Sequence, residues 1–269
     1  MKNIKLINSL LIIGMTSLFC YSCSQNEDSS SSNSIEGPKI ETTYDEIGAL
    51  HNEGLEYVFN YLVKNQATTR AANSTVSIYQ LAETAENLFL KEKGINFADT
   101  KLLTTRAKAT KSDAINLNIN QKEYYDKLMA IMSNYSMNYT VTQTAIAELA
   151  SEIQSNLSLK DAGPLLYGIG VAKYTCYYWH LNRNKWAIEF GSNVMTRGKS
   201  KPKSKEESSS VDWKRLGKED VKGAVSGAAG GAAAGALAGG AGALPGAGAG
   251  AVGGAVTNSV LEAINQFWD

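Results

Sequence analysis

Glycine recurs with helical spacing through the last fifth of the chain, and this pattern restricts the fold more than any other. Residues 223–254 comprise 13 glycines, 13 alanines and six other residues. Glycine weakens an isolated helix by about 1 kcal/mol per residue relative to alanine, so this segment needs a packing partner to be helical. Nine glycines form a ladder of four-residue steps with one three-residue step: Gly223, Gly227, Gly231, Gly235, Gly239, Gly242, Gly246, Gly250 and Gly254. Such spacing predicts a smooth helical stripe that another backbone can approach closely.

The ladder predicts a helical hairpin of two arms. No charged side chain occurs between Lys222 and Glu262. Arms of about 19 residues, near 221–239 and 247–265, would each be ~28 Å long, close to the ~30 Å hydrocarbon core of a bilayer. Pro245 is expected to break the helix between them. Basic and aromatic residues gather where the arms end, and the predicted membrane-interface anchors are Trp213, Phe267 and Trp268.

Three placements of this hairpin are compatible with the sequence. It can associate with a membrane, pack on the rest of the protein or a partner, or form a disordered tail. The regular four-residue phase argues against disorder. Alanine and glycine are only weakly hydrophobic, so insertion needs additional stability. Homo-oligomerisation through the glycine faces, or docking onto the rest of the chain, would supply it.

The N-terminus carries a second membrane signal. A short basic start precedes residues 6–19, an apolar run too short to span a bilayer but suited to a signal peptide. The run leads into Cys20-Tyr21-Ser22-Cys23, which resembles a bacterial lipoprotein signal, where cleavage precedes a cysteine that becomes acylated. The small Ser22 makes Cys23 the expected lipidation site and residues 1–22 the signal peptide. The alternative is an ordinary secretory signal whose cysteines are incidental.

A polar, Ser-rich segment follows the cysteine. Residues 23–39 contain too little apolar surface to fold and are expected to be an acylated, flexible tether. Glu27 and Asp28 lie just behind Cys23, and this acidic pair resembles the surface-export signal of lipoproteins in the Bacteroidota. The resemblance implies an outer-membrane, lipid-anchored protein that faces the cell surface.

The middle of the chain is predicted to be a helical bundle. Apolar residues recur at helical spacing in 43–64, 75–93, 120–135 and 142–159, and Gly94 is expected to end the second of these helices. No strand-like alternation of useful length occurs. We therefore expect an all-α fold: a helical bundle domain (40–196), a charged linker (197–210) and a C-terminal Gly/Ala-rich hairpin (211–269). The linker is expected to be a solvated hinge, with attraction to anionic lipid as the alternative.

The fifth predicted helix is the most apolar and is expected to be central. Asp161 is a candidate for its N-cap or first turn, Pro164 suits its first turn, and residues 165–181 are apolar on nearly all sides. Lys173 and His180 interrupt this run, which favours a buried bundle helix over a membrane span.

Catalytic and metal-binding signals are weak. His51 and His180 are the only histidines, lie far apart in the sequence and match no nucleophile or zinc motif, so neither is expected to be catalytic or a metal ligand. The glycine-rich segment is not a phosphate loop, and no cofactor is expected. The formal net charge is zero, which argues against nucleic-acid binding. Cys176 lies in an apolar run and is expected to be a small buried hydrophobe.

The combination of Cys23 with the ladder resembles glycine-zipper lipoproteins of bacterial envelopes, including the rickettsial surface-antigen type. This resemblance implies a non-enzymatic protein with two membrane-lipid contacts, the acyl chains and the hairpin. Those proteins lack a bundle such as residues 40–196. The ladder also resembles glycine-zipper bacteriocins, although their double-glycine leader is missing here, and this implies a membrane-permeabilising antibacterial effector. A soluble helical binding module with a self-packed hairpin is the remaining alternative.

Overall fold

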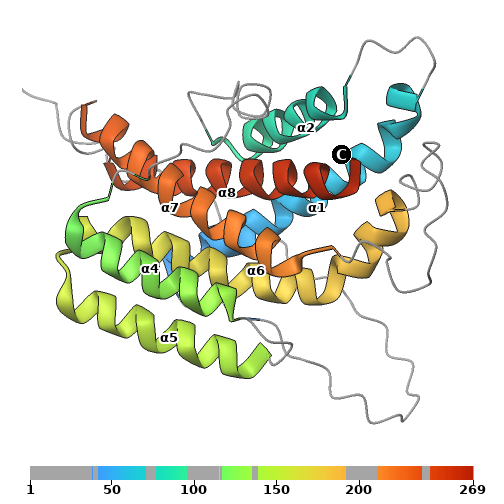
Figure 1. Ribbon diagram of the computed structural model, residues 1–269. Helices are drawn as coiled ribbons and strands as arrows, with labels where there is room; N and C mark the ends of the chain where they lie inside the picture. The colour runs from blue at the N-terminus through green and yellow to red at the C-terminus, as the bar shows by residue number, and fades with distance from the viewer. Residues whose placement is uncertain are drawn as a thin grey trace, which may run out of the picture. The chain divides into compact units, whose positions relative to one another are not determined.

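The computed structural model consists of helices. It describes residues 38, 42–70, 77–95, 115, 117–134, 139–191, 211–237 and 243–268. These residues form α1 (Thr43–Arg70), α2 (Ile78–Glu92), α4 (Ile119–Ser133), α5 (Tyr139–Asn156), α6 (Leu159–Gly191), α7 (Trp213–Leu237) and α8 (Ala243–Trp268) (Figure 1). No strand occurs in these ranges, and the all-α prediction is confirmed. The signal peptide, Cys23, the rest of the tether except Pro38, and the linker 197–210 lie outside the described residues.

Local sequence signals set several helix ends. Ser77 and Asn118 begin α2 and α4 with capping boxes, in which each side chain accepts from the backbone N–H three residues on. Gly94 ends α2 as predicted, with φ +67°. The Gly94 N–H donates to the Lys91 carbonyl at 3.1 Å and the next N–H, of Ile95, donates to the Leu90 carbonyl at 2.8 Å. This is a Schellman motif, which requires a left-handed residue such as glycine.

The two prolines near helix starts lie elsewhere than predicted. α6 begins at Leu159, where the Ser158 hydroxyl accepts from the Asp161 N–H at 3.2 Å, so Pro164 lies beyond the first turn. Pro245 was expected to break the helix between the two arms, but it lies in the first turn of α8, which begins at Ala243. Proline is tolerated there because the first-turn N–H groups have no helical partner.

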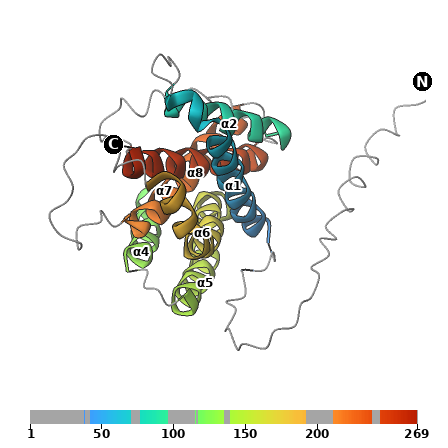
Figure 2. The same cartoon turned by 90° about the vertical axis from the view of Figure 1, so that its right-hand side faces the viewer.

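The hairpin α7–α8 is integrated into the bundle. α7 packs along α8, and α8 also contacts α1, α2 and α6 (Figures 1 and 2). α6 in turn contacts α1, α4, α5, α7 and α8. All the described helices belong to one compact unit, residues 37–269. The predicted central position of α6 is therefore found, and α8 shares it.

Glycine also allows α1 and α6 to cross closely. A Cβ added at Gly48 would lie 2.3 Å from the Gly170 carbonyl oxygen, and one at Gly170 would lie 1.9 Å from the Tyr44 backbone carbonyl oxygen. Beside this crossing, Lys173 of α6 pairs with the buried Asp45 of α1 at 2.6 Å. The backbone contact and the ion pair together hold α1 against the N-terminal half of α6.

An aromatic cluster joins the other half of α6 to the hairpin. Trp186 is fully buried, and its ring centroid lies 5.1 Å from Phe59 of α1 and 6.4 Å from Phe267 of α8. Trp179 packs at 5.5 Å from Trp186 and at 5.7 Å from Trp213, the first residue of α7. Both ends of the hairpin, Trp213 and Phe267, are thus fastened to α6.

Candidate functional site

The glycine ladder forms the contact between α7 and α8. Added Cβ atoms on α7 would lie 2.0–2.1 Å from carbonyl oxygens of α8, well inside any real contact distance. The pairs are Gly223 with Gly254, Gly227 with Gly250, and Gly231 with Gly246. Residue numbers in each pair sum to the same value, as an antiparallel arrangement requires. The ladder therefore sets the register of the hairpin.

The remaining ladder residues are less fully described. Gly235 lies on α7, whereas Gly239 and Gly242 fall outside the described residues. In the described part of the ladder, the glycine face is filled by the opposite arm of the same hairpin. That face is not open to a second chain in this conformation.

The flanks of the hairpin are buried as well. Ala224 and Ala228 of α7 and Ala251 and Ala255 of α8 are fully buried, in a cluster with Tyr167 and Val171 of α6. Six apolar residues of α8 join the core formed with α1, α2 and α6: Val252, Val256, Val260, Ala263, Ile264 and Phe267. None of the helices described combines the length and hydropathy needed to cross a membrane.

The predicted interface anchors also face inward where they can be placed. Phe267 is buried, and Trp213 is partly buried against Trp179 and Phe267. Trp268 ends α8, and its side chain lies outside the described part. In this conformation the Phe267 ring is buried in the core and does not lie at the surface.

A polar network lies at the centre of the molecule, on the side of the hairpin that faces α1 and α6. His51 of α1, Asp220 of α7 and Ser259 of α8 are each fully buried. The Ser259 hydroxyl contacts one Asp220 oxygen, Oδ1, and lies 3.0 Å from His51 Nε2. The other oxygen, Oδ2, accepts from Trp179 Nε1 at 2.9 Å and from the Thr175 hydroxyl.

His51 is fixed on its other side by an amide. Its Nδ1 lies 3.1 Å from Asn52 Oδ1, and the Asn52 amide nitrogen donates to the Tyr174 carbonyl at 2.9 Å. The network thus runs from α7 through α8 and α1 to α6. It connects the hairpin to α1 and α6, two of the helices that it packs against.

Burial shifts the ionisation of both titratable members towards their neutral forms. Loss of hydration raises the pKa of Asp220 to about 7, against the lowering effect of the Ser259, Thr175 and Trp179 hydrogen bonds. Burial lowers the pKa of His51 to about 4, and the hydrogen bond to Asn52 partly offsets this. The 3.7 Å separation of His51 Nε2 from Asp220 Oδ2 would be an ion pair only if His51 were charged.

More polar contacts join α8 to the helices around it. The buried Thr257 hydroxyl donates to Glu86 of α2, and Tyr79 of α2 donates to Asn265 at 3.1 Å. Arg215 of α7 pairs with Glu262 at 2.9 Å. Such contacts need matched geometry, so they define how the hairpin is seated more strictly than apolar packing does.

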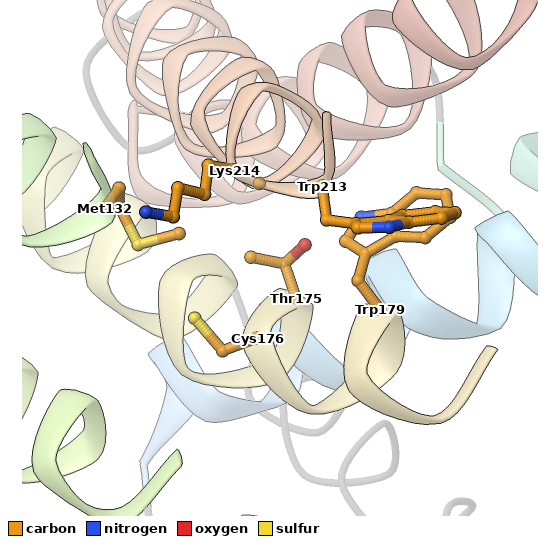
Figure 3. Close-up of a pocket in the computed structure, with 7 residues that line it drawn as sticks. Met132, Thr175, Cys176, Trp179, Trp213 and Lys214 are labelled. Atoms are coloured by element: carbon orange, nitrogen blue, oxygen red, sulfur yellow. The ribbon is translucent and has the colours of Figure 1, made fainter. Parts of the chain in front are cut away.

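A small recess lies beside the network. It is lined by Met132, Thr175, Cys176, Trp179, Trp213, Lys214 and Gly217, between α4, α6 and the start of α7 (Figure 3). Its volume of ≈ 10 Å³ accommodates about one water molecule. Cys176 is buried as predicted, and burial raises the pKa of its thiol.

The network contains serine, histidine and aspartate but differs from a hydrolytic triad. In a triad the histidine lies between the nucleophile and the acid. Here the Ser259 hydroxyl lies between His51 and Asp220, and all three are closed off from solvent. No group of three metal-ligating side chains occurs in the ranges described. The arrangement suits a structural tie between helices.

Sequence reasoning missed this network because its members are distant in the chain. His51 and Ser259 are 208 residues apart, and Asp220 and Ser259 are 39 residues apart. One signal was available: Thr257, Asn258, Ser259 and Glu262 follow a stretch of glycine, alanine and other apolar residues on the same arm. His180, the other histidine, lies on α6 and takes no part in the network.

No protein-family model matches the chain, and no curated protein or solved structure resembles it closely enough to count as a match. The geometry of the hairpin and the N-terminal signal are therefore the observations that bear on function.

Proposed function

We propose that this chain is a non-enzymatic, surface-directed outer-membrane lipoprotein. In this proposal acylated Cys23 is its resting membrane contact, and the glycine-zipper hairpin is stored inside the folded helical domain. The observation that supports a stored hairpin is that the glycine face of each arm points at the other arm. The described glycine pairs are closed by the hairpin's own backbone, and the flanking alanines are buried against α6. A role of the hairpin at a membrane then requires it to leave α1, α2 and α6.

The proposal is tested by changing the expected acylation site in cells. Cys23→Ala is expected to abolish acylation and to move the folded protein from the membrane to the soluble fraction. Cys20→Ala is the matched control, because it removes the neighbouring cysteine and should leave both properties unchanged. Metabolic labelling with a fatty acid and membrane flotation measure the two outcomes.

Persistent flotation of unacylated Cys23→Ala would contradict the proposal and favour a hairpin that is already in the membrane. Removing residues 211–269 is a poor substitute for this test. α8 supplies a large part of the core next to α1 and α2, so the truncated protein is expected to unfold.

A second candidate function is membrane permeabilisation of a neighbouring cell. It is favoured by the uncharged stretch between Lys222 and Glu262, which is unusual for helices of a soluble bundle. Each arm would have to exchange its contacts with α6 for contacts with lipid or with other copies.

The second candidate predicts that the full-length chain releases dye from vesicles of phosphatidylethanolamine and phosphatidylglycerol at neutral pH. The proposed storage of the hairpin predicts no release above that caused by an unrelated lipoprotein. Gly230→Ala serves as a control variant. Gly230 faces open space on α7, so its change should not alter the dye release.

A further inference from the structure

The hydrogen bonds around Ser259 contain a proton-counting problem. A hydroxyl group has one proton to donate. The Ser259 oxygen lies within hydrogen-bond distance of His51 Nε2, of Asp220 Oδ1 and of the Ala255 carbonyl oxygen, which is 2.9 Å away. The Ala255 carbonyl already accepts the helical N–H of Ser259, so it does not need the hydroxyl proton. If Asp220 were ionised and His51 Nε2 unprotonated, both would be acceptors competing for that single proton. One acceptor would remain unsatisfied at zero exposure, which is costly.

The tautomer of His51 follows from the amide beside it. The Asn52 amide nitrogen donates to the Tyr174 carbonyl, so the Asn52 oxygen is the atom that faces His51 Nδ1. An oxygen there can only accept, and His51 Nδ1 must carry a proton. In a neutral imidazole the other nitrogen, Nε2, is then an acceptor. One additional proton is needed, either on Asp220 or on His51 Nε2.

Placing the additional proton on Asp220 satisfies every member. The Asp220 Oδ1 hydroxyl donates to Ser259, Ser259 donates to His51 Nε2, and His51 Nδ1 donates to Asn52. Asp220 Oδ2 remains the acceptor of Thr175 and Trp179, as the carbonyl oxygen of an acid would be. The other placement buries two full charges 3.7 Å apart without any exposure to water, so each ion loses its hydration.

We propose that Asp220 is buried as the neutral carboxylic acid, and that Asp220, Ser259, His51 and Asn52 form a one-directional hydrogen-bond chain that latches the hairpin onto α1 and α6. This inference goes beyond the proposed function and does not depend on the lipid tether. The ionisation shifts of both residues have the matching sense, because burial favours the neutral form of each.

Other titratable groups near the latch are few in the described structure. From α6, the Cys176 thiol and the Tyr178 phenol lie close enough to Asp220 to interact with its carboxyl electrostatically, and burial raises the pKa of each. On α7 itself, Glu219 disfavours ionisation of Asp220. From α4 and α8, Tyr125 and Glu262 are coupled to Glu219. None of these groups supplies a positive charge to the Asp220 carboxyl.

The latch has a distinctive linkage between pH and stability. Asp220 titrates near 7 when folded and near 3.8 ordinarily, so alone it would lose stability as pH rises from about 4 to 7. His51 titrates near 4 when folded and near 6.5 ordinarily, so alone it would lose stability as pH falls from about 6.5 to 4. Between about pH 4 and 6.5, Asp220 and His51 together hold one titratable proton in the folded state (on Asp220) and one in the unfolded state (on His51). The two slopes cancel.

Single substitutions should expose the two slopes separately. Asp220→Asn mimics the neutral acid, since its oxygen accepts and its amide donates to Ser259. Relative to wild type, its unfolding constant is expected to rise by up to about tenfold per pH unit as pH falls from about 6.5 to 4. His51→Gln keeps an acceptor for Ser259, and its unfolding constant should rise by up to the same factor as pH rises from about 4 to 7. The double variant should regain the wild-type pH profile.

Urea unfolding of the full-length chain between pH 4 and 8 measures these profiles. Parallel profiles for all four proteins would overturn the proposal. Nitrogen NMR of histidine-labelled wild-type protein gives a second readout, which does not depend on a variant that folds. The chain has two histidines, so the spectrum is simple. At pH 6 His51 is expected to be the neutral Nδ1–H tautomer. A doubly protonated His51 ring would place the additional proton on His51 and not on Asp220, and would overturn the assignment.

Discussion

Gly227→Ala is expected to lower the free energy of unfolding by about 3 kcal/mol, the upper end of the usual cost of overpacking. The added methyl carbon would lie 2.0 Å from the Gly250 carbonyl oxygen and 2.7 Å from its carbon. Backbone atoms cannot rotate away, so α7 and α8 must separate. Separation also loosens the neighbouring glycine pairs on either side. Urea unfolding followed by tryptophan fluorescence measures the change.

Gly230→Ala is the matched control on the same helix. An added Cβ at Gly230 meets no atom within 4 Å, and the residue is exposed. Alanine has the higher helix propensity, so this variant should gain up to about 1 kcal/mol. If both variants changed stability in the same direction and by similar amounts, the close contact between the arms would be wrong.

Trp186→Ala is expected to cost about 3–5 kcal/mol, as is usual when a large buried aromatic side chain is removed. Trp186 has zero exposure and packs at 5.1–6.4 Å from Phe59, Trp179, Phe190 and Phe267. Its indole N–H also donates to the Tyr178 hydroxyl at 3.0 Å. The substitution removes the contact that holds the end of α8 on α6 and leaves Tyr178 without that donor.

The control for this prediction lies on the same helix. Leu181 is 54% exposed, so Leu181→Ala should change the free energy of unfolding by less than about 0.5 kcal/mol. Thermal and urea unfolding of the two variants test the pair. A loss below about 1 kcal/mol for Trp186→Ala would show that the hairpin end is not seated in this cluster.

Short-range patterns predicted much of this fold. The ladder glycines predicted a helical hairpin, and the constant sum of paired residue numbers follows from the equal four-residue spacing on its two antiparallel arms. Gly94 ended α2 because its left-handed conformation is a local property. The end of α6, residues 182–191, lay beyond the predicted apolar run of 165–181 because Asn182, Arg183 and Lys185 interrupt that run. Trp186 and Phe190, four residues apart, nevertheless keep one face of it in the core.

The partner of the hairpin could not be predicted in the same way. Small residues permit any close backbone approach, whether from lipid-embedded helices, another copy or the same chain. The choice here depends on contacts such as His51 with Ser259 and Glu86 with Thr257, which join residues 208 and 171 positions apart. Single-sequence patterns carry no information about such pairings. Cys23 and the tether lie outside the described residues, and their roles stay predictions.

The central claim is that the hairpin belongs to the folded domain when the protein is at rest. Hydrogen exchange of the acylated full-length chain on native membranes, measured against increasing urea, tests it most directly. We expect amides of α7 and α8 to lose protection in the same cooperative transition as amides of α6. Protection of α7 and α8 that persists in urea after α6 has unfolded would contradict the claim, because only a hairpin sheltered by the membrane would behave in that way.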